Sequence, residues 1–246
     1  MTTSSPKSPS PASKSAKVLI LGSGIAGLTS AIHFSEFSDV ILLAKSSLDE
    51  GNTRYAQGGI ASVWSKSDSI QEHKADTLEA GAGLCNEQIV DICVSEGPNA
   101  VQALIDWGVQ FTKTEASDYD LHQEGGHHKR RILHAQDFTG RAIEEALIAK
   151  VRSIANIYIL ENHMAIDFIM EGKIGEVKPD PKRATSGSRL GACLGAYVLN
   201  CETNDIFPLA ADMTVIASGG AGKVYLYTTN PDVATGDGIA MAYRAG

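Results

Sequence analysis

The glycine loop at residues 22–27 is the feature that most constrains the fold of this chain. It reads Gly22-Ser23-Gly24-Ile25-Ala26-Gly27 and follows an apolar run, residues 17–21, that has the length of a buried strand. In such a loop between a strand and a helix, the first glycine permits a tight turn, the second admits a pyrophosphate, and the third lets helix and strand pack closely. The loop therefore predicts a dinucleotide-binding site at a helix N-terminus.

The segments around the loop predict an α/β fold with a mainly parallel sheet. A helix is expected over residues 25–37 and a second buried strand over 40–43, which completes a βαβ unit. Beyond residue 157 the strand-like runs have no helix between them, which predicts an antiparallel β-meander. The expected meander strands are residues 157–160, 164–170, 192–200 and 206–209. An exposed loop insertion is expected at 172–189 and a further buried strand at 212–217.

Helices are expected in both halves of the chain. Ser69 and Glu72 have the spacing of a capping box, which predicts a helix that runs to about residue 80. A helix is also expected over 87–107, split in two at Gly97-Pro98. Further helices are expected over 139–154 and 237–246, whereas the polar, histidine-rich residues 119–131 are expected to form a loop.

Composition argues against several classes of protein. The formal net charge is −8, whereas nucleic-acid binding favours a basic surface. No apolar run reaches the roughly 18 residues that span a bilayer. The four cysteines form no paired motif, so we expect reduced thiols. Residues 1–16 are rich in Ser, Pro and Lys; a disordered tail is expected there, with a short organellar transit segment as the alternative.

The residue that follows the second strand leaves two dinucleotides open. An acidic residue usually stands about 20 residues after the glycine loop and holds a ribose hydroxyl. This chain has Lys45 at the end of that strand. A cation there is compatible with the phosphorylated ribose of NADP, and equally with the adenosine part of a flavin dinucleotide. The glycine loop does not decide between them.

The segment from Asn52 to Gly59 favours the flavin. It reads Asn52-Thr53-Arg54-Tyr55-Ala56-Gln57-Gly58-Gly59 and closely resembles the flavin-contacting loop of the succinate dehydrogenase and fumarate reductase flavoprotein superfamily. Residues 137–140, 217–220, 228–231 and 235–238 resemble that superfamily in the same order. Within it, residues 55–59, 124–127 and 130–135 are most similar to the L-aspartate oxidase family.

The resemblance implies a Rossmann-like FAD-binding domain over residues 17–246, with FAD as the cofactor. The residues expected to contact FAD are those of the glycine loop and the flavin-contacting loop, together with three single positions. They are Gly22, Ser23, Gly24, Ile25, Ala26, Gly27, Lys45, Asn52, Thr53, Arg54, Tyr55, Ala56, Gln57, Gly58, Gly59, Gly219 and Asp237. Asp237 is also compatible with an ordinary helix N-cap, and both roles can hold together.

Two substitutions refine what the resemblance implies. Where dehydrogenases and quinol-linked reductases of the superfamily carry a histidine bonded covalently to FAD, this chain has Asn52, whose amide can hydrogen-bond but forms no such link. Noncovalent FAD is therefore expected, which suits reoxidation by O2 or fumarate. Where members that act on succinate carry an apolar residue, this chain has Glu124, which is expected to pair with the ammonium group of aspartate. The alternative is that Glu124 is a solvated loop acid.

The histidines and arginines near Glu124 leave alternatives open. His127, His128 and His134 are compatible with loop or packing roles, and the cations that flank them disfavour a bound dication, so no metal is predicted. Arg130 and Arg131 are compatible with surface positions or with binding of a dicarboxylate.

The family resemblance implies oxidation of L-aspartate to iminoaspartate by hydride transfer to flavin N5, the first step of de novo NAD biosynthesis. The product would pass to quinolinate synthase, and the expected location is the cytoplasm, with a plastid or other organelle as the alternative. The chain is less than half the usual family length, so the capping domain, the C-terminal helical domain and the main catalytic His and Arg are expected to be missing from it. Weak or no catalysis by the isolated chain is expected.

Three rival functions remain compatible with the sequence. One is a flavoprotein like fumarate reductase or succinate dehydrogenase, and another is a nicotinamide-dependent reductase supported by Lys45 alone. The third is a non-catalytic fragment that binds FAD. The sequence does not predict an oligomeric state.

Overall fold

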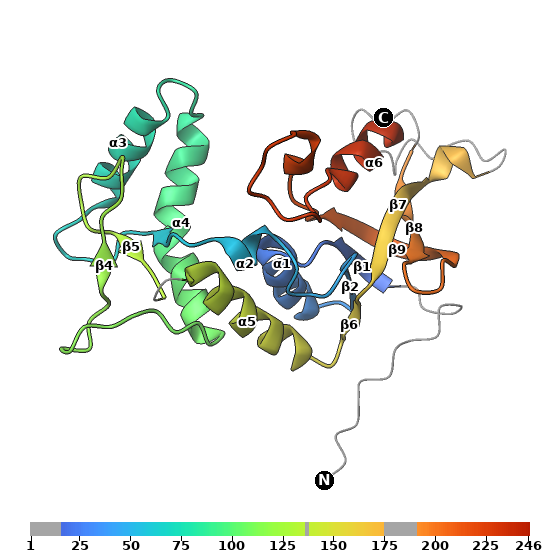
Figure 1. The fold of residues 1–246 in the computed structure, drawn as a ribbon, viewed down its shortest axis with the longest axis horizontal. Coiled ribbons are helices and arrows are strands. Elements are labelled where there is room, and N and C mark those ends of the chain that lie inside the picture. The colour runs from blue at the N-terminus through green and yellow to red at the C-terminus, as the bar shows by residue number, and fades with distance from the viewer. Residues whose placement is uncertain (1–15, 136–137, 175–190) are drawn as a thin grey trace, which may run out of the picture. The chain divides into compact units, whose positions relative to one another are not determined.

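The computed structural model describes residues 16–135, 138–174 and 191–246, which form two compact units (Figure 1). Unit 1 comprises residues 1–52 and 148–246, of which the described part begins at 16, and unit 2 comprises residues 53–147. The expected tail at 1–16 and most of the expected insertion at 172–189 lie outside the described residues.

Unit 1 is built on one six-stranded mixed sheet with the strand order β6-β2-β1-β9-β8-β7. Its strands are β1 (Ala16–Leu21), β2 (Val40–Leu43), β6 (Ile157–Leu160), β7 (His163–Met170), β8 (Cys193–Asn200) and β9 (Ile206–Ile216). Strands β6, β2, β1 and β9 are parallel, and β9-β8-β7 form an antiparallel meander. The predicted α/β class with a mainly parallel sheet and a meander is confirmed. The prediction that residues 157–160 belong to the meander was wrong, because β6 pairs in parallel with β2.

Strand β9 joins the two parts of the sheet. Residues 206–210 pair with β8 in antiparallel register and residues 211–216 pair with β1 in parallel register, so two predicted strands are one. Pro208 lies in the half that has only β8 as a neighbour, where its missing N–H breaks no ladder on the other side. The second half of β9 was predicted to be buried, yet Met213 and Ile216 are both about half exposed.

The helices of unit 1 pack against the sheet. Alternate residues of the central strands, including Leu19, Leu21, Ile41 and Leu43, share a buried cluster with Met241 of α6 (Asp237–Ala245). The helix α1 (Ile25–Ser35) contacts β1 and β2 through its buried residues Leu28, Ala31 and Ile32. Short 3-10 turns occur at Glu171–Lys173 and Gly222–Val224.

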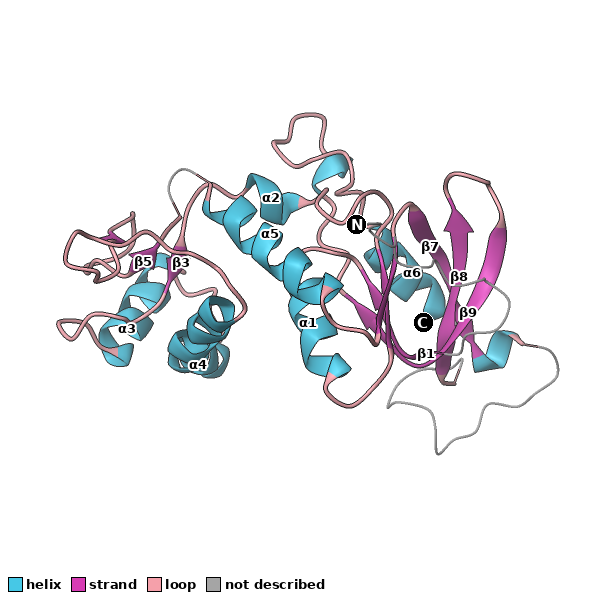
Figure 2. Cartoon of the chain, turned by 90° about the horizontal axis from the view of Figure 1, so that it is seen from below, coloured by secondary structure: helices cyan, strands magenta, loops and turns pink. Residues whose placement is uncertain are grey.

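Unit 2 contains two packed helices and a small antiparallel sheet, which Figure 2 shows together. The helices are α3 (Ile70–Ala80) and α4 (Glu87–Asp106), and the sheet has the order β3-β5-β4. Its strands are β3 (Ile60–Ala61), β4 (Leu121–His122) and β5 (Ile132–Leu133). The predicted capping box is present, because Ser69 Oγ accepts a hydrogen bond from the Glu72 N–H at 3.2 Å. Two helices cross the boundary between units: α2 (Asn52–Tyr55) and α5 (Thr139–Arg152).

Two local predictions in unit 2 were wrong. Helix α4 continues through Pro98, because Val94 before it and Val101 and Leu104 after it are all buried on one side of the helix. That burial offsets the one hydrogen bond that proline removes. Residues 119–131, expected to be loop, contribute strand β4, which pairs with β5. Among the described helices none is long and apolar enough to cross a membrane.

Candidate functional site

The glycine loop of unit 1 has the close packing that its sequence requires. Gly22 has φ +114°, a conformation that L residues rarely adopt, and a Cβ there would collide with the Ala217 carbonyl oxygen. A Cβ on Gly27 would collide with the Gly22 carbonyl oxygen. The loop therefore closes on itself and on the end of β9, which leaves no room for side chains at either glycine.

The segment after β9 and the start of α6 lie beside this loop. The Ala217 N–H donates to the Leu21 carbonyl at 2.8 Å, and a Cβ on Gly238 would collide with the Ser218 hydroxyl. Gly219, one of the predicted cofactor residues, has φ +71° and open space around it. The carboxyl ends of β1 and β9 thus bring the two glycine-rich segments and the N-terminus of α6 together.

The N-terminus of α1 lies at this edge of the sheet, directly after the glycine loop. Among the described residues no side chain caps the helix, and its first turn carries no acidic residue. Ile25 and Ala26 are exposed, whereas Ser23 is buried. The N–H groups and the dipole at a helix N-terminus favour an anion such as a pyrophosphate.

Lys45 is held by the opening residues of α6. Its Nζ donates to Asp237 Oδ2 at 2.6 Å and to Thr235 Oγ1 at 2.5 Å, and Thr235 Oγ1 donates to Asp237 Oδ1 at 2.7 Å. Burial alone would raise the pKa of Asp237, but the hydrogen bonds from Lys45 and Thr235 hold it below its ordinary value. The charge of Lys45 is therefore compensated within the protein, which disfavours a role for it in binding the extra phosphate of NADP.

Asp237 is the first residue of α6 and not its N-cap. The N-cap is Gly236, in the left-handed conformation with φ +76°. The interpretation of Asp237 as an N-cap was therefore wrong. A bulkier residue at 236 would strain the backbone and meet the Ala221 side chain.

Asn52 forms a side-chain hydrogen bond within unit 1. Asn230 Nδ2 donates to Asn52 Oδ1 at 2.7 Å, across 178 residues of sequence. The amide of Asn52 is thereby oriented, and its own NH2 group keeps its donors for another acceptor. Sequence inspection gave no signal for this partnership.

The flavin-contacting loop continues in unit 2, where a different set of contacts holds it. The Gly140 N–H donates to the Ala56 carbonyl at 2.9 Å, and a Cβ on Gly140 would collide with the Thr53 carbonyl oxygen. Arg54 pairs with the buried Glu144 of α5 at 4.0 Å. Residues 55–59 are exposed, so this loop presents its backbone to the surroundings while its base is fixed on α5.

Glu124 lies next to that loop. A Cβ built on Gly58 would be 3.6 Å from Glu124 Oε1, an ordinary contact distance, and Glu124 is exposed. A Cβ on Gly59 would instead collide with the Leu133 carbonyl oxygen of β5, so packing on the strand explains this glycine. Glu124 belongs to a turn closed by the His127 N–H, which donates to its carbonyl at 3.3 Å.

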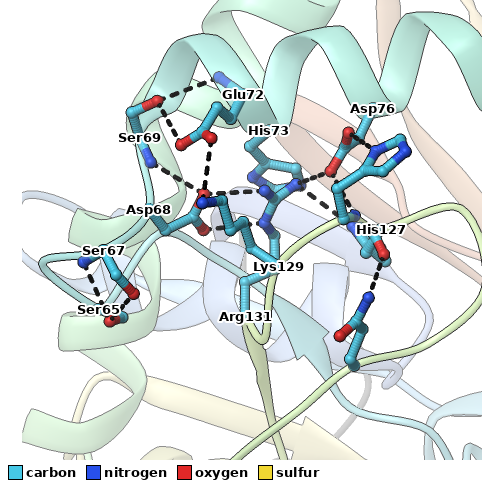
Figure 3. Close-up of polar contacts among 12 residues, drawn as sticks. Ser65, Ser67, Asp68, Ser69, Glu72, His73, Asp76, His127, Lys129 and Arg131 are labelled. Carbon is cyan, nitrogen blue, oxygen red and sulfur yellow. Dashed lines mark hydrogen bonds and ion pairs between the residues drawn. The ribbon is translucent and has the colours of Figure 1, made fainter.

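Arg131 is fully buried in a network of acids (Figure 3). Its Nε and Nη2 donate to the two oxygens of Asp68 at 2.9 and 2.8 Å, and its Nη1 donates to Asp76 Oδ2 at 2.7 Å. The interpretation of Arg131 as a dicarboxylate-binding residue is therefore wrong, because both sides of its guanidinium are occupied. Arg130 is largely exposed and donates to the Leu121 carbonyl at 2.7 Å.

Two histidines, His128 and His73, lie beside Arg131 and Asp76. His128 donates its backbone N–H to Asp76 Oδ2 at 2.9 Å, and its ring Nδ1 lies 2.5 Å from Asp76 Oδ1. Burial opposes ionisation of Asp76, but the hydrogen bonds from His128 and the charge of Arg131 lower its pKa to about 2. The hydrogen bond to Asp76 raises the pKa of His128, whereas burial and Arg131 lower the pKa of His73. Asp68 and Asp76, which sequence analysis did not single out, organise this network.

Residues 17–246 match the family model described as the FAD binding domain. The chain belongs to this family. FAD is therefore the cofactor of the domain, and the side-chain-free cradle at Gly22 and Gly27 beside the open N-terminus of α1 fits its pyrophosphate.

Among known proteins, this FAD binding domain is similar to several L-aspartate oxidases. It is 48% identical over 231 residues to L-aspartate oxidase 1 of Ralstonia nicotianae, which covers 93% of this chain and 41% of the relative. It is 42% identical over 226 residues to the chloroplastic L-aspartate oxidase 2-a of Nicotiana tabacum, covering 92% of this chain and 33% of the relative. The chain thus spans between a third and about two fifths of the length of these curated relatives.

The fold is shared with solved flavoprotein structures. A variant of the E. coli quinol fumarate reductase subunit FrdA superposes with a TM-score of 0.84 at 28% identity, covering 95% of this chain and 37% of that one. Both comparisons agree with the resemblance found from the sequence. The described residues of this FAD binding domain include neither a capping domain nor a C-terminal helical domain.

Proposed function

We propose that this FAD binding domain holds FAD noncovalently and serves an enzyme that oxidises L-aspartate to iminoaspartate. The similarity to L-aspartate oxidases at 48% and 42% identity supports this proposal. The activity, substrate and partners of those longer proteins are proposals for this chain.

The two glycine-rich segments and the N-terminus of α1 would hold the pyrophosphate. The backbone N–H groups of the first turn of α1 would be the donors, and the absence of side chains at Gly22 and Gly27 is what keeps the loop closed. Lys45 and Asp237 form a charge-compensated pair at the same edge of the sheet, available for hydrogen bonds to ribose hydroxyls.

Residues 53–59 of the flavin-contacting loop would lie against the isoalloxazine. The hydrogen bond from the Gly140 N–H to the Ala56 carbonyl and the ion pair of Arg54 with Glu144 hold the start of this segment on α5. Asn52, oriented by Asn230, is a hydrogen-bonding residue and forms no covalent bond to the cofactor. FAD supplies a two-electron acceptor when bound. The protein's part is to bind and orient the cofactor and the substrate.

The position of Glu124 beside Gly58 is the observation that carries the substrate assignment. The Glu124 carboxylate is 3.6 Å from the point where a Cβ on Gly58 would lie. It is therefore available to an ammonium group bound beside the flavin-contacting loop. Succinate and fumarate lack this group, and a carboxylate at the same place would repel them. Glu124 is therefore the residue we assign to recognition of the substrate ammonium.

The electrons removed from aspartate, two per substrate, pass in this proposal to O2 or fumarate. Quinolinate synthase is the proposed recipient of iminoaspartate, which places the reaction at the start of NAD biosynthesis. The cytoplasm is the proposed location, and a plastid is the alternative because the tobacco relative is named chloroplastic.

A spectroscopic titration of the 246-residue chain tests the proposal. The purified chain, loaded with FAD, is titrated with L-aspartate and separately with succinate while the visible flavin spectrum is recorded. We expect aspartate to perturb the spectrum at lower concentration than succinate, and Glu124→Gln to remove that preference. Glu115→Gln, which changes an exposed acid elsewhere in unit 2, is the matched control.

Three outcomes would contradict parts of the proposal. A colourless protein that binds NADPH and no FAD would favour a nicotinamide-dependent reductase. A stronger response to succinate or fumarate would favour a fumarate reductase-like flavoprotein. An aspartate response unchanged in Glu124→Gln would remove Glu124 from the substrate site.

A further inference from the structure

We propose that Asp120, His122 and His134 form a binding site for a divalent transition metal ion with nitrogen and oxygen ligands, Zn²⁺ being the type case. No metal was predicted from the sequence, where the histidines considered were His127, His128 and His134. The structure separates that trio, because His127 and His128 contact the Arg131 and Asp76 network. His134 joins His122 and Asp120 instead.

Strand pairing explains why these three side chains meet. Leu121 is paired with Leu133 in antiparallel register, so Asp120 stands opposite His134. Asp120 and His122 are two residues apart, and side chains at that spacing lie on the same face of an extended segment. A cross-strand pair and a diagonal neighbour therefore present three ligand groups on one face of the β4–β5 pair.

The distances match those between ligands of one small ion. Asp120 Oδ2 is 3.6 Å from His122 Nε2 and 3.5 Å from His134 Nε2. Both distances are long for a hydrogen bond. Ligands at about 2.0–2.1 Å from a tetrahedral Zn²⁺ are separated by roughly 3.4 Å. All three ligand atoms lie within 4.8 Å of one another, so a small closure completes the set.

His134 supplies an independent indication of a ligand. The residue is only 8% exposed, and among the described residues neither of its ring nitrogens has a hydrogen-bond partner. A buried imidazole without hydrogen bonds is costly, and coordination of one nitrogen would relieve that cost. Its ring stacks on the ring of His122, with centroids 3.7 Å apart, so the two imidazoles lie side by side.

The surroundings permit entry of an ion. The side chains of His122 and Asp120 are 52% and 39% exposed, so an ion can reach both from solvent. Arg130 approaches Asp120 at Oδ1, 4.0 Å away, while Oδ2 faces the two imidazoles. The Arg130 side chain is 63% exposed, so solvent screens its repulsion of a dication. Two imidazoles and one carboxylate leave a fourth position for water, and bound metal would link β4 to the residue after β5.

Metal titration of the whole chain tests this site. The purified chain is dialysed against a chelator and titrated with Zn²⁺ by calorimetry, and with Co²⁺ by visible ligand-field absorption. We expect one saturable site per chain. His122→Asn and Asp120→Asn should each weaken binding at least about tenfold, as is usual when the coordination of a metal site is perturbed.

His33→Asn is the matched control, because it removes an exposed histidine beside an acid in unit 1. It should leave Zn²⁺ affinity unchanged. Circular dichroism of each variant establishes that the fold is retained, and since His122 and Asp120 are partly exposed, the test does not depend on altering buried His134. No saturable binding by the wild-type chain, or equal affinities in His122→Asn, Asp120→Asn and His33→Asn, would overturn the proposal.

Discussion

Lys45 and Asp237, separated by 192 residues, form an ion pair of 2.6 Å where β2 ends and α6 begins. Both side chains are less than a third exposed, and Thr235 bonds to each of them. The pair fixes the start of α6 beside the carboxyl edge of the parallel strands. The cation that suggested a phosphorylated ribose in the sequence is in fact the partner of a carboxylate.

Lys45→Met should therefore lower the stability of unit 1. It leaves the largely buried Asp237 side chain without its cationic partner, at a cost of about 1 kcal/mol in the free energy of unfolding. Lys74→Met, which removes a more exposed pair with Asp91, is the control and should change stability by less than about half of that. Urea unfolding of the three proteins measures the difference; equal losses in both variants would argue that the Lys45 pair has no special weight.

Gly27→Ala should disrupt the glycine loop. The added methyl group collides with the Gly22 carbonyl oxygen, a backbone atom that cannot move without opening the loop. We expect a loss of about 1–3 kcal/mol in stability and weaker retention of FAD. Gly51→Ala meets nothing within 4 Å and should stay within about 0.5 kcal/mol of wild type. Thermal unfolding and flavin content after gel filtration report both effects, and normal FAD retention by Gly27→Ala would contradict the assigned packing.

Arg131→Met and Arg130→Met form a matched pair of neighbours. Removal of Arg131 leaves Asp68 and Asp76 buried without their shared cation, which should cost roughly 3–5 kcal/mol. Removal of exposed Arg130 should cost less than about 1 kcal/mol. Denaturant unfolding measures both. Similar stabilities of the two variants would show that the buried network contributes little.

The Asp76 and His128 pair should give the stability a distinct dependence on pH. The pKa of His128 is raised in the folded state, so its contribution is complete below the unfolded value near 6.5 and is lost as pH rises through the folded value. The pKa of Asp76 is lowered to about 2, so its contribution is present above the unfolded value near 3.8 and is lost as pH falls toward 2.

His128→Asn should flatten the alkaline limb of this profile and leave the acid limb, which Arg131 also supports. Unfolding free energies measured at a series of pH values check the prediction. His33→Asn should retain the wild-type alkaline limb. The same alkaline slope in His128→Asn and wild type would rule out the His128 contribution.

Acid precipitation of the FAD-loaded chain should release all flavin into the supernatant. The amide of Asn52 forms hydrogen bonds and no covalent link to FAD, and its oxygen accepts a hydrogen bond from Asn230. Absorbance of the supernatant and fluorescence of the denatured protein on a gel quantify the two fractions. Flavin that stays with the pellet would contradict noncovalent binding.

Local sequence patterns predicted much of the fold, because residues close together in the chain decide where many helices and strands form. The βαβ unit, the capping box at Ser69 and the amphipathic helix α5 all appeared where expected. The errors arose where distant partners decided the outcome. Helix α4 continues through Pro98 because it has buried residues both before and after the proline. Strand β9 is continuous because its first half pairs with β8 and its second half pairs with β1.

By itself, the sequence determined the glycine loop, the flavin family and the choice of Asn52 over a covalent attachment residue, because these depend on backbone freedom and on the chemistry of single side chains. Only the tertiary structure decided the roles of the charged and polar residues. Lys45 pairs with Asp237, Arg131 is enclosed by Asp68 and Asp76, and His134 meets His122 and Asp120. The sequence alone does not show whether a charged side chain faces solvent, a ligand or a buried counter-charge. Strand register and burial, which depend on the tertiary structure, distinguish these environments.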